Sequence, residues 1–147
     1  MVIYELGIVC NGILLVSKEY YKEYEISLDP SLRGGIFSAL TSLASEVFSD
    51  TIESFTLRNY KALLISRPHP TSKDMDIIAY CIGDKKINLE LAKDALTRIL
   101  DEFNQKYSYE DINSGNLNIY KVFEKKIDDI LGDLAKSYTD RLKSIFG

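Results

Sequence analysis

The chain has 147 residues, the length of one domain, and folding should bury about 70% of the surface that its unfolded form exposes. With 46% apolar and 27% charged residues, its composition is that of a globular protein and predicts a single domain over residues 1–147. The net charge of −4 argues against nucleic acid as a partner, because binding to phosphate backbones requires clustered Lys and Arg.

The two cysteines and the chain ends predict a cytoplasmic protein. Cys10 and Cys81 lie inside apolar runs, where a thiol usually acts as a small buried hydrophobe in a reducing compartment. Glu5 and the pair Asn11-Gly12 interrupt the first apolar run, so it does not resemble a signal peptide. No segment approaches the ~20 apolar residues that a membrane span requires, and the C-terminus carries no prenylation cysteine. We therefore expect no membrane insertion.

The chain begins with a predicted β-hairpin. Residues 2–10 are rich in β-branched and apolar side chains, and Asn11-Gly12 is the dipeptide that best tolerates the two positive φ angles of a type I′ turn. A second strand should then run from about Ile13 to Tyr21. A polar connection containing Tyr24 follows it.

A first helix is predicted over about residues 31–48. Asp29 supplies a helix cap, and Pro30 suits the first helical turn. Apolar side chains then recur at intervals of three and four, which is the period of a helix face. They are Ile36, Phe37, Leu40, Leu43, Ala44, Val47 and Phe48.

Three strands are predicted next, at about 52–58, 61–67 and 75–82. A tight turn at Asn59 separates the first two, and a longer loop through Pro68, His69 and Pro70 precedes the last. Each strand should pair with the one before it, so the three form a meander.

Two more helices complete the predicted fold. Helical spacing of apolar residues runs from Leu89 to Phe103 and is followed by a polar break at about 107–116. The same spacing resumes over about 117–146, where Gly132 weakens the middle of a long last helix that belongs to the domain.

The element order is thus ββαβββαα, which predicts an α+β fold around a five-stranded antiparallel sheet. The first, fourth and fifth strands are apolar on both faces and suit the centre of the sheet, whereas the second and third carry more charge and suit its edges. The strand order 2-1-5-4-3 satisfies both patterns and keeps hairpin neighbours adjacent. A sheet that is apolar on both faces needs helices on both, so we expect the first helix on one face and the last two on the other.

This element order and several stretches of sequence resemble the longin domains and their roadblock relatives, which belong to the profilin-like class. The stretch Leu-Arg-Gly-Gly-Ile-Phe-Ser-Ala-Leu-Thr-Ser-Leu-Ala-Ser-Glu-Val at 32–47 is similar to a longin first helix. Residues 52–57 and 59–65 are similar to the two strands that follow it, and residues 100–103, with Tyr107, to the close of the second helix. The likeness covers about residues 2–140 and consists of apolar and small residues, without a reactive group.

The resemblance implies a non-catalytic platform that binds small GTPases, their regulators, coat subunits or a second longin or roadblock chain, often as a homo- or heterodimer. A role as a scaffold in vesicle trafficking or GTPase regulation would follow. Longin proteins of the fusion machinery continue into a long heptad segment with an anchor, whereas only about 40 residues follow Tyr107 here. A free-standing longin is also what archaeal relatives of trafficking proteins look like.

No catalytic or metal-binding constellation stands out, and no cofactor is expected. The only histidine, His69, is flanked by prolines and is predicted to be a solvated loop residue. No Cys or His spacing suits zinc, and no calcium loop is present. Gly34-Gly35 at a helix start could present amides to an anion, but the surrounding pattern is not a phosphate-binding motif, so close packing or a partner contact is favoured.

The residues proposed to contact a partner come from the predicted edge strands and the start of the first helix. Tyrosines at the end of the second strand either enrich an interface or only cover the core beneath the connection. The candidate contacts are Tyr20, Tyr21, Arg33, Gly34, Leu57 and Arg58. An alternative is a ligand-sensing domain of the profilin-like or PAS-like class, which would need an internal cavity between sheet and helix.

Overall fold

The computed structural model describes residues 3–20 and 30–132. Nine elements follow one another along this part of the chain, and residues 123–132 are also helical. They are β1 (Ile3–Cys10), β2 (Ile13–Glu19), α1 (Pro30–Phe48), β3 (Ser54–Thr56), β4 (Lys61–His69), β5 (Ser72–Gly83), α2 (Leu89–Lys106), α3 (Tyr109–Asn113) and the short 3-10 helix η1 (Leu117–Tyr120).

The strands form one antiparallel sheet in the order β2-β1-β5-β4-β3, which confirms the predicted fold class and strand order. The first hairpin turns at Asn11 (φ 52°) and Gly12 (φ 79°), the two positive angles that a type I′ turn requires. Strands β1 and β5 lie in the middle of the sheet and are buried along most of their length, as their apolar residues on both faces predicted.

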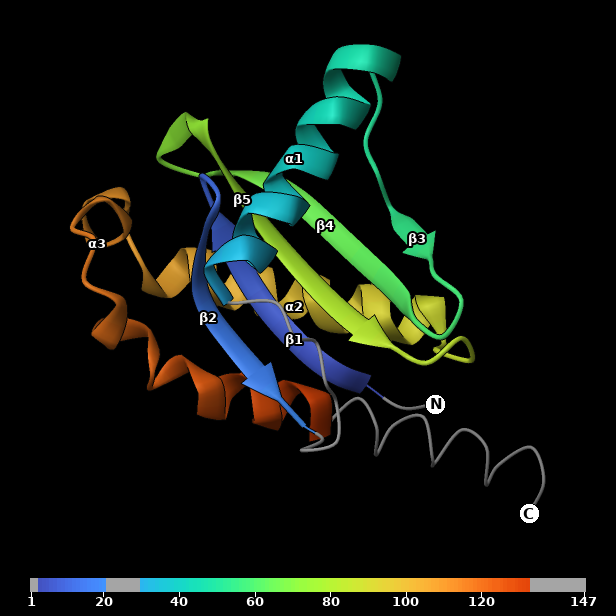
Figure 1. The fold of residues 1–147 in the computed structure, drawn as a ribbon. Helices are drawn as coiled ribbons and strands as arrows, with labels where there is room; N and C mark the ends of the chain where they lie inside the picture. Colours follow the sequence, from blue (N-terminus) through green and yellow to red (C-terminus); the bar gives the residue numbers. More distant parts are fainter. Residues whose placement is uncertain (1–2, 21–29, 133–147) are drawn as a thin grey trace.

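Helices cover the two faces of the sheet unequally (Figure 1). One face packs against α2 and the helical residues 123–132, with Leu96, Phe103 and Ile127 among its fully buried residues. The opposite face is covered by α1, through a smaller buried cluster that includes Phe37 and Tyr80. The predicted placement of one helix on one face and two on the other is thus confirmed, and α1 is the outermost layer of its side.

The β4–β5 hairpin differs from the prediction. Strand β4 continues to His69 and β5 starts at Ser72, so Pro70 and Thr71 form a tight turn where a longer loop was expected. Pro68 is tolerated because a register irregularity interrupts the pairing between Pro68 and His69. At the sheet's edge, β3 pairs only over residues 54–56, fewer than the predicted 52–58.

The C-terminal third also departs from the prediction. The expected polar break at 107–116 contains the short helix α3. A capping box between Ser108 and Asp111 stabilises the start of this helix. Of the predicted helix over 117–146, residues 117–120 form η1 and residues 123–132 are helical. Residues 133–146 and the cap Asp29 lie outside the described residues. The prediction of a single domain over 1–147 stays a prediction.

Candidate protein-interaction surface

A buried ion pair fixes the start of α1 on the sheet. Glu5 of β1 is 0% exposed and Arg33 of α1 is 6% exposed, and the Arg33 guanidinium donates to the Glu5 carboxylate. A second carboxylate, that of Glu19 at the end of β2, lies 3.3 Å from the same Nη1 atom. Buried charges are stable only when they are paired, so this pair locates the first turn of α1 above β1 and β2.

Tyr80 of β5 completes the network around Glu5. Its hydroxyl donates to the Glu5 carboxylate over 2.7 Å, and its ring lies over Gly7, where a Cβ atom would come within 2.6 Å of the hydroxyl oxygen. Burial raises the pKa of Glu5, while the Tyr80 hydrogen bond and the Arg33 charge oppose that shift. Both the carboxylate and the guanidinium are enclosed, so the network supports a structural role rather than acid–base chemistry.

Close packing at Gly34 holds α1 against the first hairpin. A Cβ atom at Gly34 would lie 2.6 Å from the carbonyl oxygen of Gly12, which leaves no room for a side chain. Ser38 lies one helical turn after Gly34, and its hydroxyl accepts a hydrogen bond from the backbone N–H of Gly12 over 3.0 Å. The pair Gly34-Gly35 therefore serves helix packing at Gly34, whereas a Cβ atom at Gly35 would meet nothing within 4 Å.

Among the described elements, α1 exposes the most large apolar side chains. Between Gly34 and Ser45 the sequence contains no charged residue, and Arg33 points inward. Five large apolar side chains of this helix are exposed: Leu32, Ile36, Leu43, Val47 and Phe48. Surface helices usually alternate an apolar face with a charged one, so a helix without exposed charge over its middle is typical of one that packs against a further molecule.

The structure places the predicted contact residues in three different settings. Arg33 and Gly34 are buried on the side of α1 that faces the sheet, so a partner protein cannot contact them directly. Tyr20 is partly buried, and its hydroxyl donates to the Asp128 carboxylate over 3.0 Å. Burial is the main cause that raises the pKa of Tyr20, and the Asp128 carboxylate raises it further. Leu57 and Arg58 are exposed and follow β3, at the sheet edge opposite to β2.

The structure therefore does not gather the predicted contacts into one surface. Tyr21 lies outside the described residues. A direct partner contact by Tyr20, Tyr21, Leu57 or Arg58 stays a prediction. The outer face of α1 as a whole was not singled out from the sequence, although the absence of charge over 34–45 could have indicated it.

His69 is buried and hydrogen-bonded, so the prediction of a solvated loop residue is wrong. It is 2% exposed, and its Nε2 atom lies 2.9 Å from the carbonyl oxygen of Tyr107, just beyond α2. The backbone N–H of Thr71 donates to Nδ1 over 3.2 Å, which leaves Nε2 as the atom that carries hydrogen and donates to Tyr107. Its role is to fasten the β4–β5 hairpin to the end of α2.

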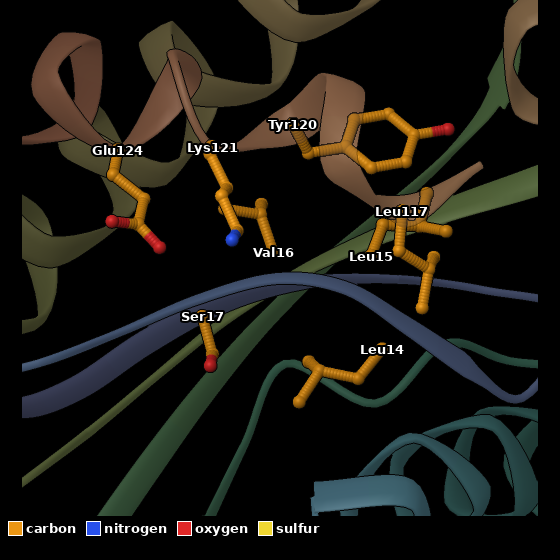
Figure 2. A pocket seen from close by; sticks show the side chains of 8 residues that line it. All are labelled: Leu14, Leu15, Val16, Ser17, Leu117, Tyr120, Lys121 and Glu124. Atoms are coloured by element: carbon orange, nitrogen blue, oxygen red, sulfur yellow. The ribbon is translucent and has the colours of Figure 1, made fainter.

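A groove lies between the edge strand β2 and the segment 117–124 (Figure 2). Its volume is about 240 Å³, and Leu117 and Lys121 reach toward the strand from one side. Leu15 and Val16 both lie on that side of β2 because the register skips Leu15 in a β-bulge. Leu117 and Lys121 are exposed, so this is a surface groove rather than an enclosed cavity.

The described residues include no group of three or more His, Cys, Asp or Glu side chains that could hold a metal ion. Within the same residues, no helix combines the length and apolarity that crossing a membrane demands. In comparisons with known proteins, no family model and no curated protein matches this chain.

Proposed function

We propose that this protein is a non-catalytic protein-interaction module of the longin type, which binds or regulates small GTPases or trafficking and coat-like partners. The observation that carries the proposal is the outer face of α1, where Leu32, Ile36 and Leu43 are exposed on a helix with no exposed charge between Gly34 and Ser45. Contiguous exposed apolar side chains cost free energy in water and mark interaction surfaces.

The inner side of the same helix supports this proposal. The Glu5–Arg33 pair and the Gly34–Gly12 contact hold α1 rigidly on the sheet, so its outer side chains are presented in a defined geometry. A rigid apolar surface loses little conformational entropy when a partner binds, which favours affinity. A helix-on-helix contact, or one that also extends the sheet at an edge strand, would bury these side chains.

The class of partner rests on the resemblance of residues 32–47 and their neighbours to longin and roadblock proteins. It makes a small GTPase or a second longin or roadblock chain the expected partner, in a homo- or heterodimer. The chain's net charge of −4 agrees with a protein partner rather than nucleic acid.

The groove beside β2 favours the second candidate function, the sensing of a small molecule. Its mixed lining of Leu117, Tyr120, Lys121 and Glu124 offers both apolar surface and charge to a ligand. Large side chains such as Tyr80, Phe103 and Phe123 instead fill the space beside the central strands. A ligand of this kind would thus bind at the surface, where less of it is buried than in an enclosed pocket.

The test is a pull-down from a lysate of the source cell, run once with GDP and once with a non-hydrolysable GTP analogue. The bait is the wild type, the variant Ile36→Ser on the outer face of α1, or the control Val122→Ser, which alters a more exposed apolar residue elsewhere. We expect a small GTPase in one nucleotide state, or a second small α/β protein, with wild type and Val122→Ser but not with Ile36→Ser.

Recovery of no protein in either nucleotide state would contradict the interaction module and favour ligand sensing. Arg58→Ala is added to the same experiment because Arg58 is exposed beside β3. If this variant binds the recovered partner as tightly as the wild type, the β3 edge is not part of the interface.

A further inference from the structure

The C-terminal end of α1 differs from the rest of the helix in its exposure. Over residues 32–48 of α1, the buried residues are Arg33, Gly34 and Phe37, all in the first half of the helix. In Figure 1 the last turns of the helix extend beyond the sheet. There Leu43 is 55% exposed, Val47 61% and Phe48 73%. Because Leu43 and Val47 are four residues apart, they lie on one face of the helix, and Phe48 at the last helical position points about 100° away from Val47.

The charged residues that follow these apolar side chains most closely in the sequence are acidic. From Gly34 to Leu57 the only charged residues are Glu46, Asp50 and Glu53, and all three are exposed. The ion pairs formed within the described part of the chain involve none of them. We refer to Leu43, Glu46, Val47, Phe48 and Asp50 together as the α1 tip, whereas Glu53 lies at the sheet edge, where its carbonyl oxygen accepts from the Leu64 N–H over 2.9 Å.

The charge at the α1 tip is unfavourable for the isolated helix. A helix C-terminus carries a partial negative charge and is stabilised by Lys or Arg in its last turn. Here the last turn contains no basic residue and includes Glu46 instead. The negative potential of the helix end thus adds to that of Glu46 and Asp50, and a positively charged molecule would relieve it.

The segment after the helix adds a concave surface beside the α1 tip. Ser49 adopts a left-handed conformation (φ 51°), and its N–H donates to the Ser45 carbonyl oxygen over 3.0 Å, which ends the helix abruptly. Residues 50–54 then line an open hollow of about 560 Å³. The lining of this hollow begins at Asp50, two residues after the helix ends at Phe48.

We propose that the α1 tip docks an amphipathic segment of a partner protein whose apolar side chains are flanked by Lys or Arg. Such a segment would cover Leu43, Val47 and Phe48 and would pair its basic residues with the carboxylates of Glu46 and Asp50. A second copy of this chain fits less well, since a symmetric contact would bring like carboxylates together. An anionic membrane would be repelled by the same charges.

This inference rests on the proposed function, because it specifies the chemistry of one partner. The experiment uses a synthetic helical peptide of about 18 residues in which leucine recurs at helical spacing among lysines. A second peptide replaces every lysine by glutamate, and vesicles of phosphatidylcholine and phosphatidylglycerol serve as a third probe. Binding to the full chain is measured by fluorescence anisotropy, and the self-association of the chain by sedimentation velocity.

Two variants and two controls locate the binding site. Phe48→Ala removes the most exposed apolar side chain of α1, and Val122→Ala is its control at an exposed apolar residue outside this helix. Glu46→Lys reverses one charge of the α1 tip, and Glu110→Lys reverses an exposed charge on α3. Lysine at a helix C-terminus is favourable, so weaker binding by Glu46→Lys would not reflect loss of the fold.

We expect the leucine–lysine peptide to bind the wild type, and Phe48→Ala and Glu46→Lys each to weaken binding at least tenfold while both controls bind as the wild type does. The affinity should fall with added salt, and neither the glutamate peptide nor the vesicles should bind. Equal binding by Phe48→Ala and wild type would overturn the proposal. Self-association or vesicle binding that Phe48→Ala abolishes would overturn it in favour of a second copy or a membrane.

Because the peptide replaces the native partner, this result and that of the pull-down are independent. Loss of peptide binding with a successful pull-down would reject only the α1 tip. Failure of the pull-down would contradict the proposed function, whereas peptide binding by the same chain would still support the α1 tip as a binding surface.

Discussion

Phe37 of α1 and Tyr80 of β5 stack with their ring centroids 4.2 Å apart and their planes 18° from parallel. The same Tyr80 donates its hydroxyl hydrogen to the buried carboxylate of Glu5. One side chain thus joins the apolar contact of α1 with the sheet to the ion pair that locates the helix start. The outer face of α1 is presented in a fixed position because of these inner contacts.

Removing the Tyr80 hydroxyl should destabilise the fold. Tyr80→Phe keeps the ring stack but leaves the buried Glu5 carboxylate with one donor fewer, which costs about 1–3 kcal/mol in the free energy of unfolding. Chemical denaturation measures this change. Tyr109→Phe, at an exposed tyrosine of α3, is the control and should change stability by less than about 0.5 kcal/mol. Equal effects of the two variants would show that the hydrogen bond to Glu5 does not contribute.

The two adjacent glycines of α1 should respond in opposite directions to alanine. Gly34→Ala places a Cβ atom against the Gly12 backbone and should destabilise the protein by about 1–3 kcal/mol. Gly35→Ala places it in open space in a helix interior and should stabilise by about 0.5–1 kcal/mol. Thermal and chemical unfolding of both variants measure these changes in stability. If both substitutions change the free energy of unfolding in the same direction, the contact of Gly34 with the first hairpin does not limit the packing of α1.

Stability should depend on pH through Glu5. Its pKa in the folded state is raised above the ordinary value of 4.5, chiefly by burial, so the folded protein binds this proton more tightly than the unfolded chain does. The contribution of Glu5 to stability is therefore complete below pH 4.5 and decreases as the pH rises through the raised pKa. The free energy of unfolding of wild type minus that of Glu5→Gln should fall as the pH rises from 4.5. A difference that grows with pH would contradict this sign.

Both cysteines should react slowly in the folded protein. Both thiols are buried, and burial is the main reason that the pKa of Cys10 is raised to about 11 and that of Cys81 to about 12. At pH 8 the thiolate fraction of Cys10 is then about one in a thousand, before access is considered. In buffer, a chromogenic disulfide reagent should label the two thiols no faster than the protein unfolds. In guanidinium, where the chain is unfolded, labelling should be complete within seconds. Rapid labelling of the native protein at either site would show that one face of the sheet opens locally.

Much of the fold was predictable from local pattern, because its signals are short-range. Asn11-Gly12 specified the hairpin turn through its positive φ angles, and period-three-and-four apolar residues marked α1 and α2. The burial of β1 and β5 followed from apolar residues on both faces of the strands. Boundaries were less predictable: the prolines around His69 indicated a loop, yet pairing with β5 carried the strand through Pro68.

The candidate site depended on contacts between distant parts of the chain. Glu5 and Arg33 are 28 positions apart and Glu5 and Tyr80 are 75 apart, so no periodicity pairs them. The sequence placed Arg33 and Gly34 at a helix start but could not tell that this side of the helix faces the sheet. His69 read as a solvated residue because its partner, the Tyr107 carbonyl, is 38 positions away.

The sequence by itself determined the order of elements, the central and edge strands, and the lack of charge over the middle of α1. These follow from side-chain type and spacing, which act over a few residues. Only the tertiary structure decided which side of α1 is buried. A helix without charged residues over its middle can pack on more than one side, and the choice was made by the Glu5–Arg33 pair and the absence of a side chain at Gly34.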